Sequence, residues 1–200
     1  MTEFSPLQAE IHKLIKSSGP MPVWRYMELC LMHPEHGYYV SRDPLGREGD
    51  FVTAPEISQM FGELIGLWAA SVWKSIGSPP TLRLVELGPG RGTMMADALR
   101  AVRVLPPLYQ SLQVHLVEIN PVLREKQRAT LSGARDITWH DSIDDVPEGP
   151  AVILANEYFD VLPIHQVVKR ETGWHERVVK LDADGKLVFA AADDPMPRFE

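Results

Sequence analysis

Three glycines within five residues interrupt the segment LVELGPGRGTMMADAL, which runs from Leu84 to Leu99. The residues before the glycines have the apolar character of a strand, and those after them have the spacing of a helix. A chain reversal after a strand needs one glycine at most, so the other two indicate a ligand that approaches the backbone closely. Because a helix N-terminus presents unpaired N–H groups, this turn predicts a site for a nucleotide-like cofactor.

Strand-like and helix-like segments alternate around this turn. We expect strands at 82–87, 113–119, 136–140 and 151–155, and helices from about Gly92 to Val104 and after Asn120-Pro121. Such alternation is typical of a parallel α/β sheet, in which ligands bind at the carboxyl ends of the strands. From residue 164 onward, short apolar runs are separated by turns at Thr172-Gly173 and Asp184-Gly185, which predicts an antiparallel C-terminal meander.

The first 80 residues are predicted to be mainly helical. Ser5 and Gln8 have the spacing of a capping box, and Thr53 and Glu56 repeat it at the start of a longer helix. The apolar residues of that helix keep a helical period and predict its buried face: Ile57, Phe61, Leu64, Ile65, Trp68, Val72 and Ile76. We therefore predict a helical N-terminal extension or lid over residues 1–80 and a cofactor-binding domain over residues 81–200.

The identity of the cofactor depends on residues beside the glycines. Glu118 ends the second predicted strand, where a carboxylate accepts hydrogen bonds from ribose hydroxyls. A dinucleotide fingerprint beginning at the first glycine needs Gly or Ala at position 93, which is Thr93. The pattern is instead acid-x-G-x-G-x-G, the form seen in methyltransferases that use S-adenosylmethionine (SAM). A dinucleotide site and a turn without a ligand are the alternatives. The residues assigned to SAM here are Glu86, Gly88, Gly90, Gly92 and Glu118.

Polar residues also follow the third and fourth predicted strands. Asp141 and Ser142 stand where they would hydrogen-bond the adenine amino group, with an ordinary turn or helix cap as the alternative. Asn156 ends the fourth strand and is assigned to the cofactor, with capping of a following helix as its alternative. Glu157 and Asp160 lie just beyond, at the rim of the sheet where methyl transfer would take place.

Composition and charge limit the kinds of partner that we expect this protein to bind. The chain has 27 acidic and 20 basic residues and a formal net charge of −7, and its basic residues are scattered, which disfavours nucleic acid and suits a basic protein or peptide. A single cysteine fits a reducing compartment, and the sequence shows neither a targeting signal nor an apolar run of membrane-spanning length. We therefore expect a cytoplasmic protein.

Cys30, His33 and His36 are spaced like metal ligands, but Pro34 between them favours a helix end and a turn, and we predict no metal site.

Four stretches in order, HPEHGYY, GDFVTAPEISQMFGELIG, LVELGPGRGTMMADAL and NEYFDVLPIHQ, closely resemble the MidA-like family of SAM-dependent methyltransferases. The resemblance implies a Rossmann-like class I methyltransferase sheet with SAM as its cofactor. Mitochondrial members assist the assembly of respiratory complex I and methylate arginine on one of its subunits, so it also implies a protein substrate of this kind. Family members are longer, which implies a sheet that is incomplete at the C-terminus, and the lack of a presequence suits a bacterial member.

For an arginine substrate, carboxylates are needed to orient the guanidinium group. Glu157 and Asp160 are three residues apart, so in the first turn of a helix they would lie on one face and hold the guanidinium as a pair. Asp50 and Glu56 are reserve candidates on a lid over the cofactor. A SAM-binding assembly factor without turnover is the alternative function, followed by an NAD-binding oxidoreductase.

Overall fold

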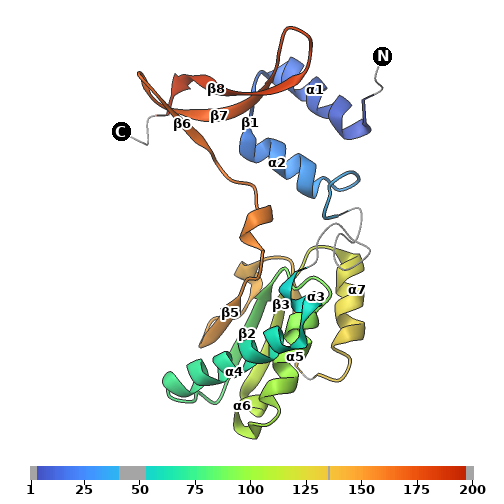
Figure 1. The fold of residues 1–200 in the computed structure, drawn as a ribbon, viewed down its shortest axis with the longest axis vertical. Coiled ribbons are helices and arrows are strands. Elements are labelled where there is room, and N and C mark those ends of the chain that lie inside the picture. Colours follow the sequence, from blue (N-terminus) through green and yellow to red (C-terminus); the bar gives the residue numbers. More distant parts are fainter. Residues whose placement is uncertain (1–3, 41–52, 135, 197–200) are drawn as a thin grey trace. The chain divides into compact units, whose positions relative to one another are not determined.

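The computed structural model describes residues 4–40, 53–134 and 136–196 of the 200-residue chain. The described residues fall into two compact units, one within Asp43–Asp160 and one formed from Met1–Arg42 and Val161–Glu200. Figure 1 shows the first unit built around a sheet with helices and the second built around a separate sheet. Each unit is described by itself below.

The first unit contains the predicted parallel sheet. Its strands lie in the order β4-β3-β2-β5, and every neighbouring pair is parallel. The bounds are β2 Leu82–Leu87, β3 Leu112–Val117, β4 Ile137–His140 and β5 Ala151–Leu154. Because β2 has β3 on one side and β5 on the other, the strand order reverses at β2, and ligands of such sheets bind in the crevice at this reversal.

Helices cover one face of the parallel sheet. Alternate residues of β2, such as Leu82 and Leu84, are fully buried against apolar side chains of these helices, as expected for strands with a period of two. The helices of this unit are α3 Ala54–Ile57, α4 Gln59–Ser75, α5 Thr93–Val102, α6 Pro106–Ser111 and α7 Pro121–Thr130. Residues of α4, α5 and α6 join the strands in one hydrophobic core.

The long helix expected after Thr53 is in fact two helices. Ser58 is extended, with φ −146° and ψ 122°, and separates α3 from α4. Its side chain accepts the N–H of Met60 at 3.3 Å, so it caps α4. A capping residue within an apolar periodic segment therefore ended one helix and began another.

The buried face of α4 agrees with the prediction only in part: Phe61, Ile65 and Val72 pack against the core as predicted. Trp68 is 52% exposed and Leu64 is 60% exposed, whereas Gly62 and Gly66 are buried. A Cβ at Gly66 would lie 2.5 Å from the carbonyl oxygen of Ala98 on α5. The two helices approach so closely at this position that a residue larger than glycine would collide with the α5 backbone.

The second unit contains the predicted antiparallel meander, which packs with the N-terminal helices. Its elements are α1 Pro6–Ser18, β1 Met21–Pro22, α2 Val23–Met32, β6 Val167–Arg170, β7 Gly173–Leu181 and β8 Leu187–Pro195. β7 pairs antiparallel with β1, β6 and β8. Ser5 accepts the N–H of Gln8 at 3.2 Å, as the capping spacing predicted.

These units have other bounds than the predicted domains 1–80 and 81–200. The helix α4 packs with the parallel sheet, and the meander shares a core with α1 and α2. The pairing of Met21 with Val179 joins segments that are far apart in the sequence, which local patterns do not reveal. Among the described helices, none combines the length and apolar character needed to cross a membrane.

Candidate functional site

The glycine turn lies at the carboxyl end of β2, where the order of the strands reverses. Gly88, Gly90 and Gly92 have φ values of 60°, 56° and 81°, and all three therefore adopt a conformation that side chains with a Cβ rarely take. The N–H of Gly88 donates to the carbonyl of Val117 at 3.0 Å, and the N–H of Gly92 donates to the carbonyl of Pro89 at 2.8 Å. The backbone conformation of the turn thus needs glycine at all three positions, whereas the sequence predicted that it needs one at most.

The glycines also allow neighbouring groups to come close. A Cβ at Gly88 would lie 2.5 Å from a ring carbon of Tyr158, which follows β5. At Gly92, which caps α5, a Cβ would lie 3.5 Å from the Cα atom of Gln127 on α7. The turn is therefore held between the end of β5 and the helix that follows β3.

Glu86 is buried two residues before the first glycine. Its side chain is 3% exposed, and its Oε2 atom has no hydrogen-bond partner among the described residues. Burial raises the pKa of this carboxyl group to about 8. A carboxyl oxygen left without a partner is costly in the interior, so this atom marks a place that suits a donor or cationic group.

Glu118 is a second buried carboxyl group, one residue beyond β3. Its Oε1 atom accepts the N–H of Asn120 at 2.8 Å, and its Oε2 atom accepts the amide of Gln127 at 3.3 Å. Burial raises its pKa, and these hydrogen bonds oppose the shift. A carboxylate accepts about four hydrogen bonds, so this group has capacity for ribose hydroxyls.

Arg124 on α7 ties together the ends of β3 and β4. Its Nε atom donates to the carbonyl of Glu118 at 2.6 Å, and one Nη atom donates to the carbonyl of His140 at 2.8 Å. The same Nη atom contacts the Asp141 carboxylate at 2.6 Å.

The sequence analysis predicted a role for neither Arg124 nor Gln127. A signal for Gln127 exists, because it interrupts the buried apolar stripe formed by Leu123 and Leu131.

Ser142 forms the helix cap that the sequence left open as an alternative. Its hydroxyl accepts the N–H of Asp144 at 3.2 Å, and its own N–H donates to the carboxylate of Asp145 at 3.2 Å. This capping box begins the short 3₁₀-helix η1 Ile143–Asp145. The side chain of Asp141 is 80% exposed beside it. A contact of either residue with adenine stays a prediction.

A family of S-adenosyl-L-methionine-dependent methyltransferases matches residues 64–199 of the chain. The matched range contains the glycine turn, both buried carboxyl groups and every strand of the parallel sheet. The chain belongs to this family. The match confirms the resemblance to MidA-like methyltransferases and the α/β fold class predicted from the sequence motifs.

Relatives of this chain include the mitochondrial protein arginine methyltransferase NDUFAF7. The Mus musculus protein is 40% identical over 220 residues, and the alignment covers 98% of this chain and 50% of the relative. The Homo sapiens protein is 40% identical over 218 residues, covering 96% of this chain and 49% of the relative. The chain thus spans about half the length of the curated relatives it matches.

A solved structure is similar over almost the whole chain. It is a COG1565 superfamily member from Burkholderia thailandensis, crystallised with S-adenosyl-homocysteine bound. The TM-score is 0.79 at 32% sequence identity, and the similarity covers 99% of this chain and 54% of that one. The likeness confirms the fold, including both sheets.

The predicted helical turn that carries Glu157 and Asp160 is wrong. Glu157 is exposed and has a positive φ of 53°, so it lies outside any right-handed helix. Asp160 is exposed within the 3₁₀-helix η2 Phe159–Val161. Apolar spacing does not reveal a residue in the left-handed conformation. Asn156 is partly buried after β5, and its contact with a cofactor stays a prediction.

The reserve candidate Glu56 lies beside the glycine turn. Its Oε1 atom accepts the hydroxyl hydrogen of Thr93 at 2.7 Å, and its Oε2 atom lies 3.9 Å from an Nη atom of Arg91. The segment before α4 is thereby attached to the first turn of α5. Asp50, the other reserve candidate, falls outside the described residues.

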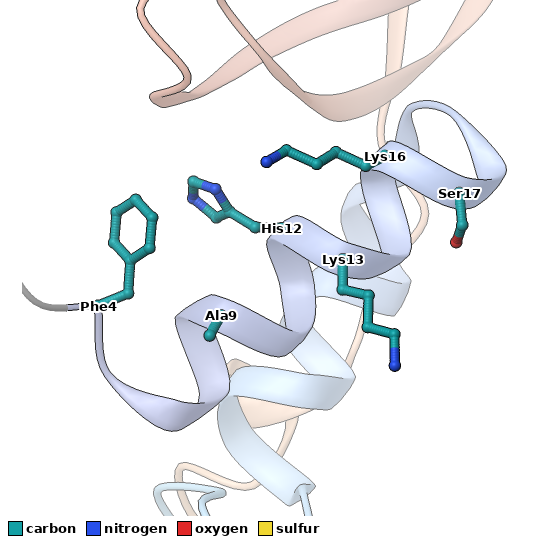
Figure 2. A pocket seen from close by; sticks show the side chains of 6 residues that line it. All are labelled: Phe4, Ala9, His12, Lys13, Lys16 and Ser17. Atoms are coloured by element: carbon teal, nitrogen blue, oxygen red, sulfur yellow. The ribbon is translucent and has the colours of Figure 1, made fainter.

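The second unit holds Cys30, His33 and His36, the residues that are spaced like metal ligands. His33 accepts the N–H groups of Glu35 and His36 through Nδ1, each at 3.2 Å, and so closes the turn after α2. A shallow surface hollow runs along α1 in the same unit (Figure 2). Its lining consists of Phe4, Ala9, His12, Lys13, Lys16 and Ser17. All the residues predicted to bind SAM belong to the other unit.

Proposed function

We propose that this chain binds SAM at the carboxyl ends of β2, β3 and β5 and is part of a methyltransferase that modifies arginine in a protein substrate. The observation that carries the proposal is the pair of buried carboxyl groups, Glu86 and Glu118, on either side of the glycine turn. The two groups belong to the ends of adjacent parallel strands at the reversal of strand order. This is the place where α/β sheets bind nucleosides.

The residues at this site fit the chemistry of SAM. Glu86 offers a buried carboxyl oxygen without a partner among the described residues, which suits the cationic amino group of the methionine end. Glu118 offers a carboxylate held by α7, which suits the two ribose hydroxyls. Bound SAM supplies a methyl group made electrophilic by its sulfonium. The protein's task is then to hold an acceptor nitrogen in line with that methyl group.

Arginine as the methyl acceptor is supported by the relatives, which are named protein arginine methyltransferases. The chain covers about half of their length. Glu157 is an exposed acid next in the chain to Tyr158, whose ring lies against Gly88 of the glycine turn. A carboxylate there would orient a guanidinium group by charge and hydrogen bonding. A subunit of respiratory complex I as substrate, and a cytoplasmic location, are further predictions from the sequence.

A SAM-binding assembly factor without turnover is the alternative with the same site. The experiment that separates the two begins with calorimetric binding of SAM and S-adenosyl-homocysteine to the protein. Methyl-labelled SAM is then added with a bacterial lysate, and labelled residues are located by mass spectrometry. Methylarginine in a protein supports the proposal, and tight SAM binding without label supports the assembly factor. A protein that binds neither compound refutes both.

Glu118→Ala is the variant that ties the binding to this site. Loss of a carboxylate that accepts ribose hydroxyls should weaken SAM binding about 10-fold or more. Asp184→Ala is the matched control, because Asp184 is an acid in a turn of the other unit. Equal affinity of Glu118→Ala and the parent protein would contradict the assigned site.

A further inference from the structure

Gln127 is a polar side chain at the centre of the described contacts between α7 and the strand ends. It is fully buried, with 0% exposure. Its Nε2 atom lies 2.7 Å from the carbonyl oxygen of Gly90 and 3.3 Å from Oε2 of Glu118. Its Oε1 atom lies 2.8 Å from the indole Nε1 of Trp139 on β4. One side chain thus links three adjacent strands of the sheet.

The orientation of this amide follows from its partners. The indole N–H of Trp139 can only donate, so it must face the amide oxygen of Gln127. The amide nitrogen then faces two acceptors, the Gly90 carbonyl and the Glu118 carboxylate, and it has two hydrogens to give them. Every polar atom of the amide is used, and no rotated arrangement satisfies the same three partners.

A buried amide at this position is not what packing alone would select. Leu123, one helical turn earlier on α7, and Leu131, which caps its C-terminus, are both buried apolar residues. Burying an amide costs free energy unless its hydrogen bonds are made. Two of the three partners, Gly90 and Glu118, belong to the residues proposed to bind SAM. The amide is therefore hydrogen-bonded to two residues of the proposed cofactor site.

We propose that Gln127 is a positioning residue for SAM. It holds the Glu118 carboxylate at a set distance from the glycine turn, so that the ribose and the methionine end of one cofactor molecule are bound together. Trp139 fixes the amide orientation from the far side. The inference rests on the proposed SAM site and assigns to α7 the task of setting its geometry.

Gln127→Met tests this role, because methionine has nearly the same length and lacks all three hydrogen bonds. Leu123→Met is the matched control, a conservative change on the same stripe of the same helix. We expect Gln127→Met to raise the calorimetric Kd for S-adenosyl-homocysteine about 10-fold, and Leu123→Met to leave it unchanged. Thermal unfolding by circular dichroism shows that each variant is folded.

Coupling to Glu118 distinguishes positioning from general support of the fold. If Gln127 acts through Glu118, Gln127→Met should add little further loss of affinity in a Glu118→Ala protein. Gln127→Glu gives a second readout that does not depend on the methionine variant. Protonated, its carboxyl group still donates one hydrogen bond. Ionised, it repels Glu118, so the affinity should fall more steeply with rising pH than in the parent.

Three results would overturn the inference: unchanged affinity of folded Gln127→Met, a full additional loss in the Glu118→Ala background, or a pH profile of Gln127→Glu identical to that of the parent. A parent protein that binds neither SAM nor S-adenosyl-homocysteine would overturn the proposed function and this inference with it. A parent that binds both while the variants bind equally well overturns the inference alone.

Discussion

The ring of Tyr158 occupies the space that a side chain at Gly88 would need: a Cβ on Gly88 would lie 2.5 Å from the ring's Cδ2 atom. Gly88 also has a φ of 60°, which costs a residue with a Cβ about 1–2 kcal/mol. The end of β5 therefore packs on the glycine turn of β2 through a contact that only glycine permits. Two separate penalties, backbone strain and collision, apply to any larger residue.

Gly88→Ala should lower the free energy of unfolding by about 1–3 kcal/mol, because both penalties act. Tyr158→Ala added to Gly88→Ala removes the collision but leaves the backbone strain, so the double variant should lose less than the sum of the two single variants. Urea unfolding of the four proteins provides the measurement. Stability of Gly88→Ala equal to that of the parent would show that the turn adapts at no cost.

Gly66→Ala should destabilise the protein although alanine favours helices by about 1 kcal/mol over glycine. The added Cβ would lie 2.5 Å from the carbonyl oxygen of Ala98, a backbone atom that cannot rotate away. We expect a net loss of about 1–3 kcal/mol in urea unfolding. Ser71→Ala, on an exposed position of the same helix, is the control and should change stability by less than about 0.5 kcal/mol. A stabilised Gly66→Ala protein would rule out the close approach of α4 and α5.

The sequence predicts the centre of the parallel sheet well because β2 and β3 are buried along most of their length and rich in apolar residues. The predicted strand 82–87 agrees with β2 Leu82–Leu87, and the predicted 151–155 differs from β5 by one residue. Periodicity predicts the buried face of α4 only in part, because Phe61 and Ile65 pack against the core while the closest contact with α5 is made at small residues beside them. Trp68 is 52% exposed.

The candidate site is only partly predictable for a different reason. The glycine turn, Glu86 and Glu118 are adjacent to strand ends, so their placement follows from local order along the chain. Gln127 is brought to Glu118 by the packing of α7 on the sheet, a contact over nine residues that no local motif encodes. The conformation of Glu157 depends on a single backbone angle, which the residue type does not predict.

Glu86→Gln should change how stability depends on pH. Burial raises the pKa of Glu86 from 4.5 in the unfolded chain to about 8 in the folded protein. The folded state then holds its proton more tightly, so this contribution to stability is fully present below about pH 4.5 and is lost as the pH rises toward about 8. The loss has a limiting slope of about 1.4 kcal/mol per pH unit.

Glutamine has the same shape and does not titrate, so the stability of Glu86→Gln relative to the parent should rise steadily across this range. Urea unfolding at a series of pH values measures the difference. Glu63→Gln is the control, because the pKa of Glu63 is lowered by hydrogen bonds from Gln59 and Arg100 and the group is exposed to solvent. Parallel pH profiles of Glu86→Gln and the parent would show that Glu86 finds a partner when folded.

Glu157 has a positive φ, so two substitutions can separate the effect of its charge from that of its backbone strain. Glu157→Gly removes the side chain and relieves the left-handed strain, so it should raise the free energy of unfolding by up to about 1 kcal/mol. Glu157→Gln keeps the shape and removes only the charge, so stability should stay near that of the parent. If the carboxylate orients a substrate guanidinium, both variants should bind SAM normally and lose about 10²-fold in methyl transfer.

Asp160→Asn removes the other exposed acid by the same kind of change and shows whether the two acids act together. Rates are compared with labelled SAM under conditions in which the parent protein transfers methyl groups. A parent rate in Glu157→Gln would exclude charge as the contribution of Glu157. A rate lost in Glu157→Gln but kept in Glu157→Gly would instead mean that the amide obstructs the acceptor. Loss in both, with a more stable glycine variant, would indicate that the protein tolerates strain at this residue because its carboxylate is needed for the reaction.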